Sequence, residues 1–405
     1  MRLPKVEDIE ARIPRPEHFD ESRRGLPTTS RVGRALGIAF GICFLTGMWS
    51  HFQYTDPAWL PIGPDPAWLY RWSQGLHIIS GTAAVPLVLV KLWSVYPHLF
   101  ARPPGKEDKR ALVLEALSRL SIGVLVASSL FMLASGTLNI SGWYPWDFSF
   151  RRTHEAVAWI AIGSLVLHIG VKLPLIRDGL DASIDDSDNH NDGDDDGDTD
   201  GDTDDSAGHT SRRALLAATG AASGLAVLLT AGQTVPFLRQ VSVFGVRDGE
   251  GPQDLPINRT ARGAGAVAGA TSPDFTLTIM SGEQSVTLTL DDLRALPQTT
   301  HTLPIACVEG WSRSAEWTGV PVRDLIAMVG ADPKSTVQFR STQTRGAFGS
   351  SELPSQFTED SRTLLALRLN GEVLSIDHGF PCRLIAPNRP GVLQTKWVNK
   401  MEVVT

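Results

Sequence analysis

Five long apolar runs occupy the amino-terminal half of the chain. They cover roughly residues 33–52, 75–96, 113–138, 155–175 and 214–235. A helix needs about 20 mostly apolar residues to cross the hydrocarbon core of a bilayer. We therefore expect a multi-domain membrane protein, with a four-helix transmembrane bundle over residues 33–176 and a fifth transmembrane helix within residues 211–238.

From about residue 240 the pattern changes to short apolar alternations separated by Gly, Pro, Asn and Asp. Such alternations predict strands, and Val322–Val329 is predicted to form a helix. Residues 240–405 are enough to bury a core of their own. We expect a strand-rich α+β domain, with strands at Phe275–Met280, Ser285–Leu290, Val337–Ser341, Leu364–Leu369 and Lys400–Val404.

The charges are unevenly distributed along the chain. The formal net charge is -7, but 13 aspartates and no Lys or Arg lie between Asp181 and Asp205, so without those aspartates it would be +6. The excess positive charge lies in loops that flank the apolar runs, which argues against nucleic acid as a partner. Residues 177–210 are expected to be a disordered acidic linker, because like charges repel and no apolar face is present. A calcium-binding EF-hand loop is disfavoured, since the linker has no Glu to close it.

Loop charges also predict the orientation in a membrane. The amino-terminal segment 1–32 and the loop 97–112 are rich in Lys and Arg, whereas the loops 53–74 and 139–153 hold few. Cytoplasmic loops carry the excess of such residues. We expect a multi-pass protein of the cell membrane, in contact with lipid, with a cytoplasmic amino terminus and linker. An odd number of spans then places residues 240–405 outside the cytoplasm.

Histidines of the apolar runs predict haem. His154 and His168 are 14 residues apart and return to nearly the same face of a helix, roughly 21 Å apart along its axis. Two stacked b-type haems need this spacing if each iron takes one imidazole from the helix. His77 lies at the depth of His154 and is its expected axial partner, with His51 as a rival. Lys91 stands 14 residues after His77, so one haem is favoured over two. The alternative is that these histidines are ordinary interfacial residues.

Aromatic residues gather in the loops expected outside. They are most simply an interfacial belt, but a quinone site near them would let a haem exchange electrons with the quinone pool. The residues are Trp59, Trp68, Trp72, Trp143, Tyr144 and Trp146.

The chain has three cysteines, too few for a disulfide scaffold. Cys307 ends a predicted strand and enters the turn Glu309-Gly310-Trp311. A thiolate there can be a nucleophile, a metal ligand, half of a disulfide or simply buried. Residue type alone favours burial or pairing with Cys382. A protease-like Cys/His pair is weak, because His301 and His378 show no distinctive spacing.

Residues 250–405 resemble the molybdopterin-binding domain of the sulfite oxidase superfamily. The block around Cys307, followed by a Trp-Thr-Gly-Val-Pro block and two later blocks, carries the resemblance. The motifs are Leu255-Pro256-Ile257-Asn258-Arg259, Ala306-Cys307-Val308-Glu309-Gly310-Trp311, Trp317-Thr318-Gly319-Val320-Pro321, His378-Gly379-Phe380-Pro381-Cys382-Arg383-Leu384 and Leu393-Gln394-Thr395-Lys396-Trp397.

The resemblance implies the ligands of a molybdenum cofactor. It makes Cys307 the molybdenum ligand, beside the dithiolene and oxo groups, and such a soft thiolate suits a metal that exchanges one oxygen atom and two electrons. Arg383 and Lys396 would neutralise the cofactor phosphate, and Cys382 is expected to be buried. The residues implied to surround the pterin are Asn258, Thr342, His378, Arg383 and Lys396.

The sequence after the cysteine narrows the resemblance. Animal and plant sulfite oxidases have Asn and Arg after it and carry an additional immunoglobulin-like domain. Glu309-Gly310-Trp311 makes this chain more similar to the catalytic subunit of bacterial methionine sulfoxide reductases, which works with a separate haem b membrane subunit. Here the corresponding helices would be fused in the same chain. Arg313, Arg340 and Arg345 are either an anion site or surface residues.

Ser211-Arg212-Arg213 opens the fifth apolar run and resembles a twin-arginine signal inside the chain. Two arginines that only obey the positive-inside rule are the alternative. A molybdenum cofactor is inserted in the cytoplasm, so the outer domain would have to cross the membrane folded. We therefore expect the twin-arginine translocase to be a partner during export.

These observations together predict a membrane-bound molybdopterin oxidoreductase. It would transfer oxygen to or from a small-molecule substrate at molybdenum and exchange electrons through haem b with the quinone pool. The alternative function is a membrane-tethered binding module that keeps a sulfite oxidase-like fold without redox turnover.

Overall fold

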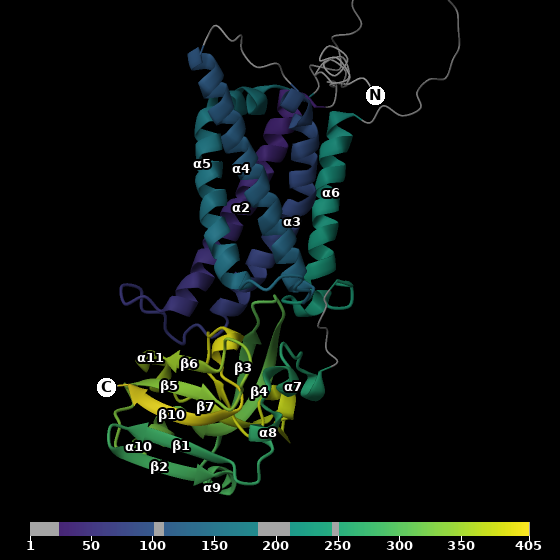
Figure 1. Cartoon of the computed structure of the whole chain (residues 1–405). Helices are drawn as coiled ribbons and strands as arrows, with labels where there is room; N and C mark the ends of the chain where they lie inside the picture. The colour runs from purple at the N-terminus through teal and green to yellow at the C-terminus, as the bar shows by residue number, and fades with distance from the viewer. Residues whose placement is uncertain (1–23, 101–108, 185–210, 245–250, 405) are drawn as a thin grey trace, which may run out of the picture. The chain divides into compact units, whose positions relative to one another are not determined.

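The computed structural model describes residues 24–100, 109–184, 211–244 and 251–404, and within them each apolar run is a helix (Figure 1). All five helices are long and apolar enough to cross a membrane, judged by length and composition. The first begins before residue 33, because a polar turn with Thr28 and Thr29 precedes its apolar part. The helices are α2 (Leu26–Thr55), α3 (Leu69–Val95), α4 (Lys109–Ile140), α5 (Phe150–Asp181) and α6 (Arg212–Ala231).

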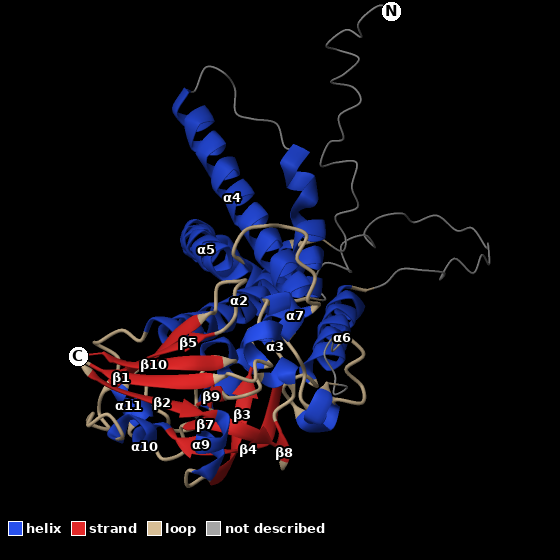
Figure 2. Cartoon of the chain, turned by 60° about the horizontal axis from the view of Figure 1, so that its bottom comes forward, coloured by secondary structure: helices blue, strands red, loops and turns tan. Residues whose placement is uncertain are grey.

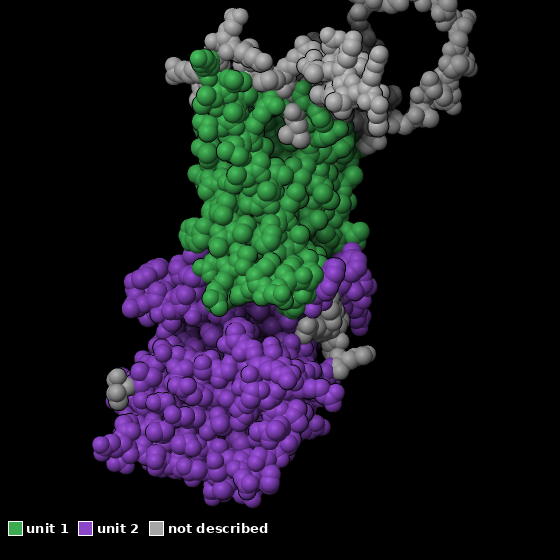
Figure 3. Space-filling view, viewed as in Figure 1, with its two compact units in different colours: residues 1–44, 80–139, 144–227 green, residues 45–79, 140–143, 228–405 purple. Residues whose placement is uncertain are grey.

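The chain divides into two compact units, coloured green and purple in Figure 3. Unit 1 comprises Met1–Phe44, Ser80–Asn139 and Tyr144–Val227. Unit 2 comprises Leu45–Ile79, Ile140–Trp143 and Leu228–Thr405. The end of α2 and the start of α3 thus cluster with the carboxy-terminal domain. Most of the predicted acidic linker and of the predicted segment 1–32 lies outside the described residues, and the predicted domain bounds remain predictions.

Polar contacts join the helices of unit 1. Arg31 of α2 donates to the carbonyls of Gly179 at 3.1 Å and Ala182 at 3.0 Å, at the end of α5. Lys91 of α3 donates to the Thr29 carbonyl at 2.9 Å. Arg31 therefore satisfies carbonyls at the end of α5 that have no partner within that helix, and Lys91 joins α3 to the first turn of α2.

The strands of unit 2 form two five-stranded sheets within the described residues, red in Figure 2. One has the order β2-β1-β10-β5-β6, with β1 and β10 parallel. The other has the order β3-β4-β7-β8, with β9 paired to β7. The strands are β1 (Thr276–Ser281), β2 (Gln284–Thr289), β3 (Thr299–Ala306), β4 (Ser312–Pro321), β5 (Thr336–Ser341), β6 (Ser350–Leu353), β7 (Leu364–Leu369), β8 (Glu372–Val373), β9 (Arg383–Ile385) and β10 (Val398–Val404).

Short helices lie at the ends of these strands. The predicted helix at Val322–Val329 is confirmed as α10 (Val322–Ala327), and all five predicted strands are confirmed within a residue or two. The other short helices are α7 (Ala261–Ala264), α8 (Val267–Ala270), α9 (Leu290–Ala295) and α11 (Ser355–Thr358).

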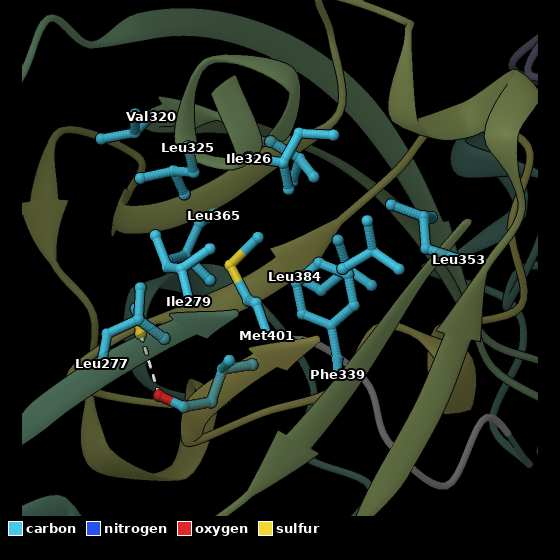
Figure 4. Packing of buried hydrophobic residues seen from close by; sticks show 14 of the residues in the cluster. Leu277, Ile279, Val320, Leu325, Ile326, Phe339, Leu353, Leu365, Leu384 and Met401 are labelled. Atoms are coloured by element: carbon cyan, nitrogen blue, oxygen red, sulfur yellow. Dashed lines mark hydrogen bonds between the residues drawn. The ribbon is translucent and has the colours of Figure 1, made fainter. Parts of the chain in front are cut away.

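The main core draws on both sheets and α10 (Figure 4). Met401 of β10 and Phe339 of β5 contribute from one sheet, Leu365 of β7 and Leu384 of β9 from the other, and Ile326 from α10. Each is fully buried or nearly so. Burial of a side chain of this size stabilises the fold by about 1.5–3 kcal/mol. The core fixes how β9, and so Arg383 at its start, lies against the other strands.

Candidate functional site

Cys307 lies in the turn that follows β3. Its backbone N–H donates to the Trp311 carbonyl at 2.9 Å, and the Gly310 N–H donates to the Cys307 carbonyl at 2.9 Å. Gly310 has a φ of +95°, which an L side chain rarely adopts, so this turn needs glycine. The thiol is 2% exposed and contacts a carboxylate oxygen of Glu309 at 3.6 Å.

Cys307 and Cys382 are both buried, and neither forms a disulfide. The alternative that Cys307 pairs with Cys382 is therefore wrong. The Cys382 thiol instead donates to the Val398 carbonyl at 3.2 Å, and burial raises its pKa. Cys382 is thus an inert core residue, as expected.

Two cations lie together in this domain. Arg383 is 4% exposed, donates to the His378 carbonyl at 3.0 Å and lies 5.2 Å from the Trp317 ring centre. The Lys396 ammonium donates to Oδ1 of Asn258 at 3.3 Å, and also to two backbone carbonyls, those of Arg259 and Asp377.

Gly379 allows these cations to approach each other. A Cβ at this position would lie 3.0 Å from the Cβ of Arg383 and 3.1 Å from the Cβ of Lys396, and its φ is +112°. A larger residue would force the two side chains apart and strain the backbone. The close packing of Arg383 and Lys396 and the positive φ thus explain why glycine occupies position 379 of the motif.

The pKa values of Arg383, Lys396 and His378 are all lowered, so their positive charges are unfavourable here. Burial lowers the pKa of Arg383 to about 9. Burial, and then the charge of Arg383, lower the pKa of Lys396 to about 7, while the Cys307 thiolate acts in the opposite direction. Burial and Arg383 likewise lower the pKa of His378 to about 4. Buried cations that destabilise one another in this way call for an anion.

Buried polar atoms fit such an anion. Among the described residues, Nε of Arg383 and Oγ1 of Thr342 are buried without a hydrogen-bond partner. The Thr342 backbone N–H donates to the Trp397 carbonyl at 2.9 Å. Thr342 is thus bonded to the residue that follows Lys396 in the chain. A cofactor that carries a phosphate and takes a thiolate as metal ligand would fit the residues present.

His378 serves this site through its backbone. Its ring Nε2 lies 2.7 Å from the Pro252 carbonyl, and its own carbonyl accepts from Arg383. The ring is therefore anchored on Pro252, and the carbonyl of His378 positions the Arg383 guanidinium. Asn258, Thr342, His378, Arg383 and Lys396 are joined by these contacts; their predicted roles toward a cofactor remain predictions.

The three arginines considered as an anion site differ in environment. Arg313 on β4 is 5% exposed and donates to the carbonyls of Ser312 at 3.0 Å and Gln233 at 3.4 Å. Arg340 and Arg345 are exposed. Sequence reasoning overlooked Gln233 and Thr234, which follow α6 and hold the strand after the cysteine turn.

Two of the predicted haem histidines, His77 and His154, each face a hydroxyl and a glycine on another helix. In unit 2, His77 Nδ1 lies 3.3 Å from Thr46 Oγ1, and a Cβ on Gly47 would lie 3.2 Å from the ring. In unit 1, His154 Nδ1 lies 3.2 Å from Ser135 Oγ, and a Cβ on Gly136 would lie 3.7 Å from the ring. His168, also on α5 in unit 1, is half-buried. Sequence spacing had not signalled these Thr-Gly and Ser-Gly pairs.

A family match covers the carboxy-terminal residues. The family model of the oxidoreductase molybdopterin binding domain matches residues 264–405. The match contains Cys307, Thr342, His378, Arg383 and Lys396, whereas Asn258 precedes it.

Known relatives align over part of the chain. The mitochondrial sulfite oxidase of Drosophila melanogaster is 33% identical over 156 residues, 32% of this chain and 27% of that protein. The putative protein-methionine-sulfoxide reductase subunit YedZ1 of Azospira oryzae is 33% identical over 116 residues, 28% of this chain and 43% of that protein. Among solved structures, the sulfane dehydrogenase SoxCD of Paracoccus pantotrophus aligns with a TM-score of 0.29 and 27% identity, covering 32% of this chain and 38% of that one. The chain thus spans less than half the length of each.

Proposed function

Because residues 264–405 are a molybdopterin-binding oxidoreductase domain of the sulfite oxidase family, we propose that the chain is a membrane-bound enzyme that transfers an oxygen atom at molybdenum. The observation that carries the proposal is the buried Cys307 after β3, which forms no disulfide, in a domain where the buried Arg383 and the half-buried Lys396 require an anion. The cofactor, when bound, supplies the metal that exchanges one oxygen atom and two electrons.

The residues of the site divide the work of holding this cofactor. Cys307 contributes a thiolate ligand, and the Lys396 charge favours that thiolate. Arg383 and Lys396 bind the phosphate by charge-assisted hydrogen bonds. Thr342 and Asn258 would contribute polar atoms to its binding, and His378 holds Arg383 in place through its carbonyl.

The substrate is proposed to carry oxygen on sulfur. Two of the relatives are named a sulfite oxidase and a protein-methionine-sulfoxide reductase subunit. Oxidation of sulfite adds water-derived oxygen and releases two electrons, whereas reduction of a sulfoxide consumes two electrons and two protons and releases water. The enzyme can therefore be assayed in both directions.

Haem b and the quinone pool are proposed to supply or accept the electrons. His77 and His154 would ligate the haem iron, His168 would belong to a second, less supported site, and His51 is the next candidate. A histidine that ligates a metal through one ring nitrogen is commonly oriented by a hydrogen bond on the other. Thr46 beside His77 and Ser135 beside His154 supply that partner, and Gly47 and Gly136 leave room for the rings.

The membrane orientation is part of the proposal. The five apolar helices would cross the cell membrane, with a cytoplasmic amino terminus and residues 240–405 outside. Arg212 and Arg213 open α6 and are proposed to direct export of the folded domain through the twin-arginine translocase. The distribution of Lys and Arg in the loops supports this orientation.

Metal, haem and turnover measurements on detergent-purified protein test the proposal. We expect about one molybdenum atom per chain and a reduced b-type haem spectrum. We also expect turnover of sulfite with ferricyanide or of methionine sulfoxide with reduced benzyl viologen. The rival function, a membrane-tethered binding module without redox turnover, predicts neither metal nor turnover. A folded protein that contains no molybdenum and turns over neither substrate would contradict the proposed enzyme function.

A further inference from the structure

The cysteine turn of unit 2 packs on the first turns of α3. Nε2 of Gln74 donates to the Val308 carbonyl at 3.4 Å, one residue after Cys307. A Cβ on Gly310 would lie 2.0 Å from Cδ1 of Ile78, so the turn and the helix touch at a glycine. Gln74 and Ile78 are both buried. His77 belongs to the same helical turn.

The segment after α6, with Gln233 and Thr234, contacts the same turn. Thr234 Oγ1 donates to the Gly310 carbonyl at 3.2 Å, and the Ser312 N–H donates to the Gln233 carbonyl at 3.0 Å. A Cβ on Gly75 of α3 would lie 2.3 Å from Thr234. The turn that carries Cys307 is thus held between two segments, and one of them carries His77.

Within the proposed function, on which this inference rests, we propose that the Gln74–Val308 and Ile78–Gly310 contacts form the electron bridge between the cysteine turn and the helix of His77. Electron transfer weakens steeply with distance and is faster through bonds and hydrogen bonds than through gaps. The route from Cys307 runs one residue to Val308, across one hydrogen bond to Gln74, and three residues along α3 to His77. Gln74 and Ile78 are positioning residues for this transfer.

Electrons would cross this bridge one at a time, although the substrate and quinone reactions each require two electrons. A sulfoxide and a quinol give a thioether, water and a quinone; sulfite, water and a quinone give sulfate and a quinol. Both reactions move two electrons and two protons. A haem iron carries one electron at a time, so each turnover needs two passages across the contact.

Stopped-flow kinetics on the full chain test the bridge. In the parent, the haem is reduced with menadiol and mixed with methionine sulfoxide; with sulfite, haem reduction is followed instead. We expect Gln74→Leu, which keeps the bulk but removes the donor, to slow the haem step several-fold, because the route then loses the hydrogen bond that joins Val308 to Gln74. Ile78→Ala is a second variant with the same expected direction.

A bypass assay and a matched glutamine separate transfer from folding. Reduced benzyl viologen with methionine sulfoxide, or ferricyanide with sulfite, exchanges electrons with the molybdenum site directly, so Gln74→Leu should retain this activity. Gln53 is the control: it is 5% exposed against 6% for Gln74, belongs to the same segment of unit 2, and donates to Asn388 instead at 3.5 Å. Gln53→Leu should leave both rates at the parent level.

Hydrogen–deuterium exchange gives a readout that needs no turnover. Gln74→Leu should speed exchange in peptides that cover residues 307–312, and Gln53→Leu should not. Selective loss of the haem step, with faster exchange, supports the bridge. Equal haem rates in Gln74→Leu and the parent, parallel loss of both activities, or unchanged exchange would each overturn it. A parent haem that does not respond to either substrate would overturn the proposed function instead.

Discussion

Oδ1 of Asn388 accepts a hydrogen bond from the backbone N–H of Tyr70 at 2.9 Å, across 318 residues of sequence. The Asn388 amide also donates to the Gly63 carbonyl at 2.8 Å. Tyr70 lies in the first turn of α3, where a helix leaves its N–H groups without internal partners. One buried asparagine therefore caps this helix from the carboxy-terminal domain and fixes the loop before it. Arg362 adds a bidentate ion pair to Asp65 of the same loop.

Removing this cap should destabilise unit 2. Asn388→Ala leaves the buried Tyr70 N–H and Gly63 carbonyl without their partner, which costs about 1–3 kcal/mol. Thermal unfolding followed by tryptophan fluorescence should therefore begin at a lower temperature. Asn399→Ala, an asparagine of β10 outside this contact, is the matched control. Equal unfolding of both variants would contradict the role of Asn388.

His378 should make stability depend on pH. Burial, and then Arg383, hold its pKa at about 4 in the folded protein, against 6.5 ordinarily. Between pH 4 and pH 6.5, His378 is therefore protonated in the unfolded chain but neutral in the folded protein. The stabilising contribution is complete above pH 6.5 and is lost as the pH falls toward 4, by about 3 kcal/mol at 1.36 kcal/mol per unit. His378→Gln should flatten the unfolding free energy against pH over this window; a parent-like slope would contradict the assignment.

Haem binding can be tested one ligand at a time. His77→Ala and His154→Ala should each abolish the low-spin b-type absorbance, because six-coordinate iron needs both imidazoles. His51→Ala, at the end of α2, should keep it. Thr46→Val and Ser135→Ala should preserve the haem but shift its midpoint potential, since the hydroxyl beside Nδ1 tunes the ligand. If His51→Ala removes the absorbance and His77→Ala does not, the pair is misassigned.

Export can be tested with a charge-preserving change. Replacing Arg212 and Arg213 by Lys keeps the positive charge that orients α6 but removes the guanidinium pair. We expect the first four helices to insert while residues 240–405 stay on the cytoplasmic side. Protease added to spheroplasts should cleave the domain in the parent and spare it in the double variant. Equal cleavage would reduce the pair to a positive-inside anchor.

The sequence predicted what depends on local pattern. Apolar length identified the five helices, and alternation identified β1, β2, β5, β7 and β10. β4 was not predicted, because the buried Arg313 interrupts its alternation of apolar and polar residues. β9 was not predicted, because three residues are too few to show an alternation.

The site followed from motif resemblance rather than pattern. Spacing offers no reason for Asn258, 138 residues before Lys396, to contact it. The contacts of Asn388 with Tyr70 and of Gln74 with Val308 depend on packing between distant segments. No periodicity in one chain encodes such contacts.

The most direct measurement compares turnover and molybdenum content in two cysteine variants of the purified full chain. Cys307→Ser replaces the proposed thiolate ligand, whereas Cys382→Ser alters a buried thiol that donates only within the core. We predict that Cys307→Ser loses oxygen-atom transfer with both sulfite and methionine sulfoxide, while its fold and haem spectrum persist. Cys382→Ser should keep molybdenum and turnover. Parent-level turnover in Cys307→Ser would contradict oxygen transfer at a molybdenum centre held by this cysteine.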